Sequence, residues 1–213
     1  MARYIGSICK LSRRVGVDLN LKSRGSRDVS SKCKLKIFPG QHGSKRKKIS
    51  GNYSTQLNSK RVIKYTYGVL EKQFKRYYSI VSKKRGIKGL LLLKLLESRL
   101  DNVVYRMGFA STRAEARQLV SHKSIIVKES NSYEKVINIP SYIVKTGCLI
   151  KVSDKSKSQV RIQHALSCAE KTGFANWVSV DIKNMTGLFV KVPDRKDLPI
   201  DFNEQMVIES YSK

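Results

Sequence analysis

The sequence has little of what catalysis requires. Histidine occurs three times among the 213 residues, as His42, His122 and His164. A nucleophilic Ser or Cys needs a nearby base and a third group that orients the base, but His42 and His122 lie among cations rather than beside a carboxylate. No nucleophile-elbow, P-loop or dinucleotide-binding motif is present either. We therefore expect that the protein is not an enzyme.

Cysteine is also scarce, with Cys9, Cys33, Cys148 and Cys168 and no C-x-x-C pair. Free thiols are the default for a protein that stays in a reducing cytosol. Cys9, Cys33 and His42 share one basic segment, but structural zinc takes four ligands at short spacings, and this segment offers three. We expect two reduced thiols there, with no zinc and no other cofactor.

Long apolar runs are missing as well. The best candidate, residues 90–96, is interrupted by Lys94 and is far shorter than the roughly 18 residues of a membrane span. The opening residues, MARYIG, lack the apolar stretch of a signal peptide. We expect no membrane partner and a protein that remains in the cytoplasm.

Acidic residues are few compared with basic ones. Asp and Glu number 16 against 43 Lys and Arg, which gives a formal net charge of +27. Self-repulsion at such a charge opposes compaction unless a polyanion neutralises it, and a strongly basic domain is typical of a nucleic-acid binder. A merely solvated basic surface is the alternative, and the size of the excess argues against it. Because 40% of the residues are hydrophobic, a folded core is expected beside this charge.

Residues 1–50 form a basic segment that is rich in Ser and Gly and only weakly periodic. Such a segment buries little apolar surface by itself, so we expect an extended arm with short helical turns, ordered mainly against RNA. The sequence PGQHG at 39–43 predicts a tight turn. That turn would place Gln41 and His42 beside the basic cluster at 45–48.

Helical periodicity dominates the middle of the chain. An apolar stripe at steps of three and four residues predicts one long helix over 53–83. A second helix is predicted over 89–107, with Gly108 at the left-handed position that ends it. The sequence TRAE at 112–115 is a capping box for a third helix that runs to about Ser121.

The third helix carries the clearest candidate site. Arg113 and Arg117 are four residues apart and so share a helical face, which Arg106, His122 and Lys123 can extend. Guanidinium groups bind phosphate oxygens through two parallel hydrogen bonds, and a rigid basic helix–turn–helix can recognise the shape of double-stranded RNA. A solvated face on a core helix is the alternative, and the overall charge favours RNA.

After residue 124 the pattern changes to short β-branched segments separated by turn residues, which is typical of strands. Strands are predicted at 124–127, 136–139, 148–152, 177–180 and 187–192, with helices at 157–171 and 203–211.

Several stretches resemble one known family. Residues 95–109 and 112–122 are similar to an RNA-binding module that some RNA-modifying and tRNA-charging enzymes also carry. Five further stretches distinguish the ribosomal family from the enzymes that carry this module, namely 1–4, 11–14, 39–43, 67–74 and 207–213. With them, essentially the whole chain resembles the family of bacterial small-subunit ribosomal protein four.

The resemblance implies an α+β fold in two domains. A mainly helical, discontinuous domain would contain the basic N-terminal arm and residues 1–88, completed by 193–213. The inserted domain, residues 89–192, would join RNA-binding helices to a small antiparallel sheet.

The resemblance also implies a function, that of a structural protein of the small ribosomal subunit in the cytoplasm. Such a protein binds the small-subunit rRNA directly, nucleates assembly of the subunit body and contributes to translational accuracy near the mRNA entry path. The implied partners are rRNA, ribosomal protein five of the small subunit, mRNA near the entry path and, in some members, the protein's own mRNA as an autoregulatory target.

The charge pattern and the resemblance together predict a set of RNA-contacting residues. They are Arg3, Tyr4, Arg13, Arg14, Lys22, Gln41, His42, Lys45, Arg46, Lys47, Lys48, Lys60, Arg61, Lys64, Arg99, Asn102, Arg106, Arg113, Arg117, Gln118, Ser121, His122 and Lys123. Replacing Arg113 and Arg117 by Glu is expected to weaken RNA binding and to leave the fold intact.

Two features depart from the family pattern. Zinc-carrying members have four cysteines in the arm, whereas here Ser12 and Ser26 stand at two of those places and only Cys9 and Cys33 match. The segment 127–136 is longer than the family's tight Asn-Gly turn, so contacts at its tip are not carried over.

Two alternative functions would each require a further feature. An RNA-modifying enzyme that uses the same module as an appendage would need a separate catalytic domain, and the chain has no room for one. A free chaperone-like binder of tRNA or of stalled ribosomal RNA would be lost from subunits after a moderate salt wash.

Overall fold

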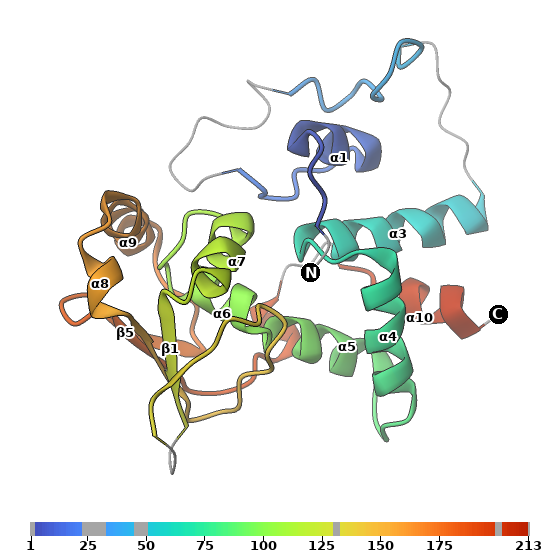
Figure 1. Cartoon of the computed structure of the whole chain (residues 1–213). Helices are drawn as coiled ribbons and strands as arrows, with labels where there is room; N and C mark the ends of the chain where they lie inside the picture. The colour runs from blue at the N-terminus through green and yellow to red at the C-terminus, as the bar shows by residue number, and fades with distance from the viewer. Residues whose placement is uncertain (1–2, 23–32, 45–50, 130–132, 199–201, 213) are drawn as a thin grey trace. The chain divides into compact units, whose positions relative to one another are not determined.

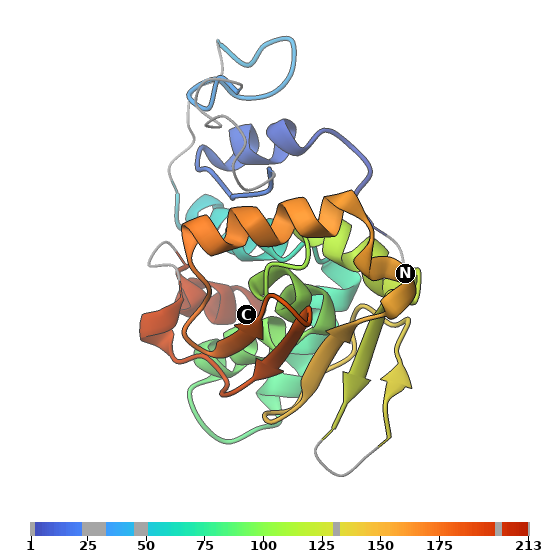
Figure 2. The ribbon, with the colours of Figure 1, turned by 90° about the vertical axis from the view of Figure 1, so that its left-hand side faces the viewer.

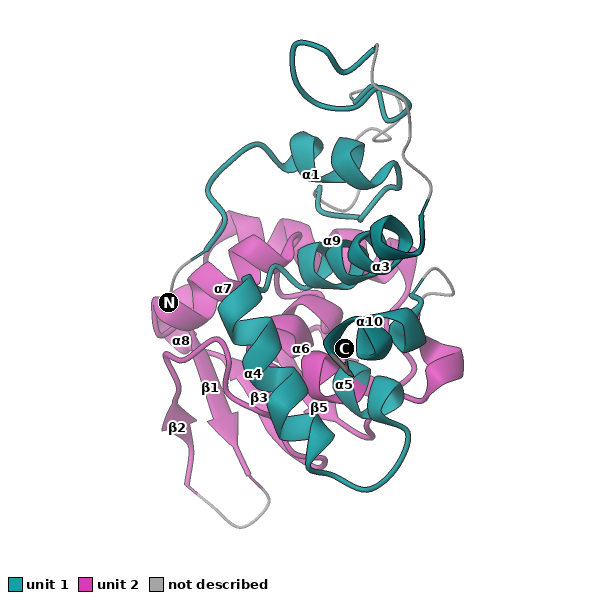
Figure 3. Cartoon of the chain, turned by 90° about the vertical axis from the view of Figure 1, so that its right-hand side faces the viewer, with its two compact units in different colours: residues 1–22, 26–93, 199–213 teal, residues 23–25, 94–198 magenta. Residues whose placement is uncertain are grey.

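The computed structural model describes residues 3–22, 33–44, 51–129, 133–198 and 202–212 (Figure 1). The chain forms two compact units, which Figure 3 distinguishes by colour: residues 1–22, 26–93 and 199–213 in one, and residues 23–25 and 94–198 in the other. The sequence placed the inserted domain at 89–192, whereas the long segment of the second unit runs from 94 to 198. Helices make up the first unit and helices with a sheet the second, so the α+β prediction is confirmed.

The first unit is helical. Its helices are α1 (Ile8–Val15), α3 (Asn52–Thr66), α4 (Glu71–Ser82) and α10 (Glu204–Ser212), and α5 (Lys88–Glu97) begins in it. The prediction of one helix over 53–83 is wrong, because the chain breaks between α3 and α4. Gly68 takes the left-handed conformation there (φ +61°) and lets the Val69 N–H donate to the Lys64 carbonyl at 3.0 Å, which closes α3.

The apolar stripe of the predicted helix nevertheless forms the core of this unit. Ile63, Phe74 and Val81 are buried on the two successive helices. The C-terminal helix α10 packs against α3 and buries Val207. Its Tyr211 ring stacks on Tyr78 with the ring centroids 4.7 Å apart. The predicted helix at 203–211 is thus confirmed, and it completes the hydrophobic core.

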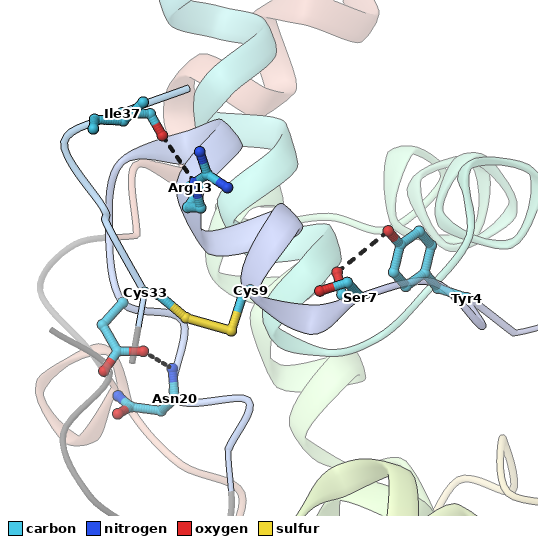
Figure 4. Close-up of a disulfide and its surroundings, with 8 residues drawn as sticks. Tyr4, Ser7, Cys9, Arg13, Asn20, Cys33 and Ile37 are labelled. Atoms are coloured by element: carbon cyan, nitrogen blue, oxygen red, sulfur yellow. Dashed lines mark hydrogen bonds between the residues drawn. A yellow bond between two sulfur atoms is a disulfide. The ribbon is translucent and has the colours of Figure 1, made fainter. Parts of the chain in front are cut away.

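The described part of the arm folds back on α1, which itself contacts α3. Figure 4 shows the disulfide between Cys9 and Cys33, whose Cα atoms lie 6.0 Å apart, and the Arg13 side chain that donates to the Ile37 carbonyl at 3.0 Å. The prediction of two reduced thiols is therefore wrong for this structure. The two cysteines are 24 residues apart in the sequence. No local pattern in the sequence indicates that they lie close together.

The sheet of the second unit contains β1 (Ile125–Lys128), β2 (Lys135–Val136), β3 (Leu149–Val152), β4 (Val178–Asp181) and β5 (Thr186–Phe189). Its strand order is β2-β1-β3-β5-β4, with antiparallel pairing throughout. Alternate residues such as Ile125, Val127 and Ile150 are buried, as expected for a sheet with one covered face. Strands β2 and β5 are shorter than predicted.

The second unit also contains helices before and between its strands. Strand β3 leads into α8 (Asp154–Lys157) and α9 (Val160–Thr172), shown in orange in Figure 2. The remaining elements are α6 (Leu100–Arg106), α7 (Arg113–Ser121) and the short 3₁₀ helix η1 (Arg195–Asp197). None of the helices in the described ranges is long and apolar enough to span a bilayer.

The predicted helix over 89–107 is divided into α5 and α6. Arg99 is extended and forms an isolated bridge with Ile143. The Val144 N–H donates to the Ser98 carbonyl and the Leu100 N–H to the Tyr142 carbonyl, both at 2.8 Å. The division thus arises from pairing with a segment some 40 residues away, which helical periodicity does not indicate.

Candidate nucleic-acid interface

Two buried carboxylates organise the helical part of the second unit. Glu97 ends α5 and is 0% exposed, and Asp101 lies in the first turn of α6 at 2%. A buried carboxylate is strongly unfavourable unless cations or donors pair with it. Both find partners in a hydrogen-bonded arginine–carboxylate cluster that contains Glu97, Arg99, Asp101, Asn102, Arg106, Arg113 and Arg117.

Glu97 holds Arg106. The Arg106 guanidinium donates from Nη2 to Oε1 at 2.6 Å and from Nε to Oε2 at 3.1 Å, which is the two-pronged geometry of a strong charge-assisted pair. The same guanidinium lies 5.2 Å from the centroid of the Trp177 ring, a distance suited to a cation–π contact. The Arg106 side chain remains 17% exposed. The buried Glu97 carboxylate therefore holds a side chain that is still partly accessible.

Asp101 holds two arginines. Arg99 donates from Nε to Oδ1 at 3.0 Å and from Nη2 to Oδ2 at 2.7 Å. Arg117, one helix further on, donates to Oδ2 from Nη2 at 2.8 Å and from Nε at 3.1 Å. Arg99 is completely buried, whereas the side chain of Arg117 is 13% exposed. Asp101 therefore links the buried start of α6 to a partly exposed cation on α7.

Asn102 joins the two halves of the cluster. Its Nδ2 donates to Glu97 Oε2 at 2.5 Å, and its Oδ1 accepts from Arg113 Nε at 2.8 Å. The Arg113 guanidinium also lies over the Tyr105 ring, 4.4 Å from the centroid. Since four arginines and two carboxylates share the cluster, it keeps a net positive charge.

Helix α7 is held at its start as the sequence predicts. The Glu115 N–H donates to the Thr112 side chain at 3.1 Å, and the Glu115 carboxylate accepts from the Ser111 N–H at 2.8 Å. The second bond reaches one residue further back than in an ordinary capping box. A rigid helix start with basic side chains along the helix is suited to bind a phosphate backbone.

Comparisons with known proteins bear on this site. Residues 3–97 match the model of the ribosomal protein S4/S9 N-terminal domain, and residues 98–127 match that of the S4 domain. The chain is 55% identical to small ribosomal subunit protein uS4 of Neisseria meningitidis serogroup B and 56% identical to that of Chromobacterium violaceum, each over 213 residues and 100% of both chains. The chain belongs to the uS4 family. The RNA-binding, non-enzymatic character and the small-subunit family expected from the sequence are thereby confirmed.

Membership in the uS4 family does not assign individual contact residues. The structure shows which of the predicted residues are buried and which are exposed. Arg99 and Asn102 are buried, so neither presents its side chain to RNA, and their prediction as contact residues does not fit the structure. Sequence alone pointed to their charge and polarity, whereas their burial depends on the packing of α5, α6 and α7.

The remaining predicted residues of the second unit lie along one helix and its surroundings. Arg106, Arg113 and Arg117 are partly exposed, and the exposed positions follow on α7 and its end. Those positions are Gln118, Ser121, His122 and Lys123. Reversal of Arg117 to Glu would place a carboxylate against the buried Asp101, so from the structure we expect this change to destabilise the fold.

In the first unit of this uS4-family chain, several predicted cations already have protein partners. Lys60 and Lys64 donate to the Glu71 carboxylate at 2.8 Å and 2.9 Å, and Arg61 donates to Asn58 at 3.3 Å. Arg3, Tyr4, Arg14, Gln41 and His42 are exposed, and Arg13 and Lys22 are half-buried. Lys45, Arg46, Lys47 and Lys48 lie outside the described residues.

The arm adds a basic hollow to the first unit. It has a volume of about 470 Å³ and is lined by Arg13, Val15, Gly16, Leu35, Lys36, Ile37, Phe38, Gly43 and Ser44. Arg13 is fixed in it by hydrogen bonds to the Ile37 and Phe38 carbonyls, both at 3.0 Å. The predicted turn at 39–43 thus lies beside a cation on α1.

Sequence reasoning missed the residues that hold the arginines. Glu97, Asp101, Tyr105 and Trp177 were not among the predicted site residues, although Glu97 and Asp101 are the acidic residues nearest to Arg99 in the chain. Glu97 directly follows the apolar run that ends at Leu96. An acidic residue next to such a run could have indicated a buried ion pair.

Proposed function

We propose that this chain is a structural component of the small ribosomal subunit that binds rRNA directly and nucleates assembly of the subunit body. The observation that carries the proposal is the arginine–carboxylate cluster, which holds partly exposed arginine side chains on two adjacent helices. Full-length similarity to small ribosomal subunit proteins supports it. No catalytic step is needed for this role, because positioned charge and shape supply the binding.

We propose that each unit contributes its own RNA-contacting residues. In the second unit they are Arg106, Arg113, Arg117, Gln118, Ser121, His122 and Lys123, and in the first they are Arg3, Tyr4, Arg13, Arg14, Lys22, Gln41 and His42 with the basic residues 45–48. Lys60, Arg61 and Lys64 on α3 would contribute charge, although they also contact Glu71 or Asn58.

The family relationship suggests finer roles, which we include in the proposal. They are contact with ribosomal protein five of the small subunit, a place near the mRNA entry path with an effect on translational accuracy, and repression of the protein's own message. The proposal also includes a location on the cytoplasmic ribosome.

We also infer that the arm works without zinc. Structural zinc is bound through thiolates, and the two arm cysteines are bonded to each other in the structure. Ser12, at a place where zinc-carrying members have cysteine, is buried and has no thiol to offer. The disulfide, together with the contacts of Arg13, supplies the connection that a metal would make.

The test is the salt dependence of binding to a small-subunit rRNA fragment. Each phosphate neutralised adds roughly 0.7 to 0.9 to the slope of log affinity against log salt. We expect a slope that corresponds to several phosphates, and retention of the chain on subunits after a moderate salt wash. A slope near zero would overturn direct rRNA binding, and loss in the wash would favour a free RNA chaperone.

A further inference from the structure

We propose that Glu97 and Asp101 are positioning residues for RNA binding, which hold the guanidinium groups of Arg106 and Arg117 in the orientation that phosphate requires. The inference rests on the proposed function, since it concerns the same surface. It assigns a binding role to two acidic side chains that could not themselves approach a polyanion.

The first argument is the geometry of the pairs. Glu97 is wholly buried and bonds two nitrogens of Arg106, Nε and Nη2, so that one edge of the planar group is fixed. Asp101 bonds the same two nitrogens of Arg117. A guanidinium held by one edge has its plane set. The side chains of Arg106 and Arg117 remain 17% and 13% exposed.

The second argument is conformational entropy. A solvated arginine samples many rotamers and loses that freedom when it binds a phosphate. Here the side chains are ordered when the protein folds, because each is pinned to a buried carboxylate. RNA binding would therefore meet preorganised donors, and preorganisation raises affinity by removing an ordering cost.

The third argument is the way in which the cluster is connected. Asn102 bonds Glu97 through Nδ2 and Arg113 through Oδ1, so the orientation of Arg113 depends on the Glu97 carboxylate as well. The buried Arg99 bonds Asp101 on its other side and keeps that carboxylate from turning away from Arg117. Three partly exposed arginines are thus oriented by two carboxylates.

Positioning and simple electrostatics predict effects of opposite sign. Replacing a carboxylate by its amide removes a negative charge close to the RNA surface, so electrostatics alone predicts tighter binding. If the carboxylate positions an arginine, the same change weakens binding because the guanidinium loses its orientation. Glu97→Gln and Asp101→Asn keep the side-chain shape and therefore separate the two effects.

The matched control is Glu115→Gln. Glu115 lies on α7 and its carboxylate accepts from the Ser111 N–H. The change removes the same charge and leaves an amide oxygen that can accept from this N–H. We expect Glu115→Gln to bind rRNA as tightly as the wild type or slightly tighter. Asp101→Asn and Glu97→Gln should each bind about tenfold more weakly, the loss of about one charge-assisted contact.

The decisive measurement is a double-mutant cycle with the full chain and the small-subunit rRNA fragment, followed over a salt series. Asp101→Asn should lower the log–log salt slope by about 0.9, the equivalent of one phosphate. In an Arg117→Ala background, Asp101→Asn should have little further effect on affinity. Equal losses in both backgrounds would show that Asp101 acts through general stability and would overturn the proposal.

Folding is checked separately by urea denaturation. If Asp101→Asn does not fold, Asp101→Glu keeps the charge and displaces it by one methylene, and it should fold and bind more weakly. If a folded Asp101 or Glu97 variant binds rRNA with wild-type affinity, the positioning role is refuted. A steep salt slope of the wild type would in that case still support direct rRNA binding. A flat salt slope in the wild type would instead refute the proposed function itself.

Discussion

At the scale of single residues, carboxylates do much of the organising in this very basic chain. Glu71 in the first unit accepts hydrogen bonds from Lys60, Lys64 and the Tyr211 hydroxyl at 2.8–2.9 Å. Burial alone would raise the pKa of Glu71, but these three hydrogen bonds outweigh it and lower the pKa from 4.5 to about 2. Burial raises the pKa of Tyr211, and its hydrogen bond to Glu71 raises it further.

The lowered pKa predicts a dependence of stability on pH. Since the folded pKa is below the unfolded one, Glu71 stabilises the fold fully above pH 4.5 and loses this contribution as the pH falls towards 2. Urea midpoints between pH 4.5 and 2 should fall more steeply for the wild type than for Glu71→Gln. The control Glu170→Gln, at an exposed position of α9, should follow the wild type. Equal slopes for the wild type and Glu71→Gln would contradict this assignment.

At the scale of elements, periodicity predicted which faces are buried but not where helices end. The stripe of Ile63, Phe74 and Val81 is buried as expected, although two helices carry it. A hydrophobic stripe shows which face of a helix packs on the core. The short break between α3 and α4 leaves the apolar residues of both helices on the buried side, so the stripe does not reveal the break. The break between α5 and α6 depends on pairing with the segment around Ile143, so a local pattern could not show it.

The turn between α6 and α7 is an element whose requirement was visible in the sequence. Gly108 has φ +81°, as predicted, and a Cβ there would lie 2.5 Å from the Ala169 Cβ on α9. Gly108→Ala thus combines backbone strain with a clash, and we expect a loss of about 3 kcal/mol of unfolding free energy.

Gly16→Ala is the matched control for that prediction. Gly16 has φ +80° at the end of α1, and a Cβ would meet nothing within 4 Å. Strain alone should therefore cost about 1 kcal/mol. Urea denaturation of both variants checks the difference, and equal losses would show that the contact with Ala169 relaxes without cost.

At the scale of the whole molecule, the C-terminal segment completes the first unit. Helix α10 packs on α3, buries Val207 and brings Tyr211 to Glu71. The first unit thus combines segments that are far apart in the sequence, whereas residues 94–198 contain the sheet and the arginine–carboxylate cluster within one unit.

Removal of residues 204–213 tests this dependence. The truncated chain should lose hydrogen-exchange protection in α3 and α4, because their apolar face would be exposed, and should keep protection in β1 and β3. The control is Tyr211→Phe, which removes one hydrogen bond and leaves α10 in place. Uniform loss of protection in both units would show that they do not unfold separately.

The sequence by itself determined the polyanionic partner, the α+β class and the family, since these depend on charge, periodicity and motifs that local residues carry. It also indicated Gly108 and the start of α7. Only the tertiary structure decided that Arg99 and Asn102 are buried, that Cys9 meets Cys33, and that Glu97 and Asp101 hold the arginines. These outcomes depend on contacts between separate elements, and burial and partner choice are properties of packing rather than of the residues alone.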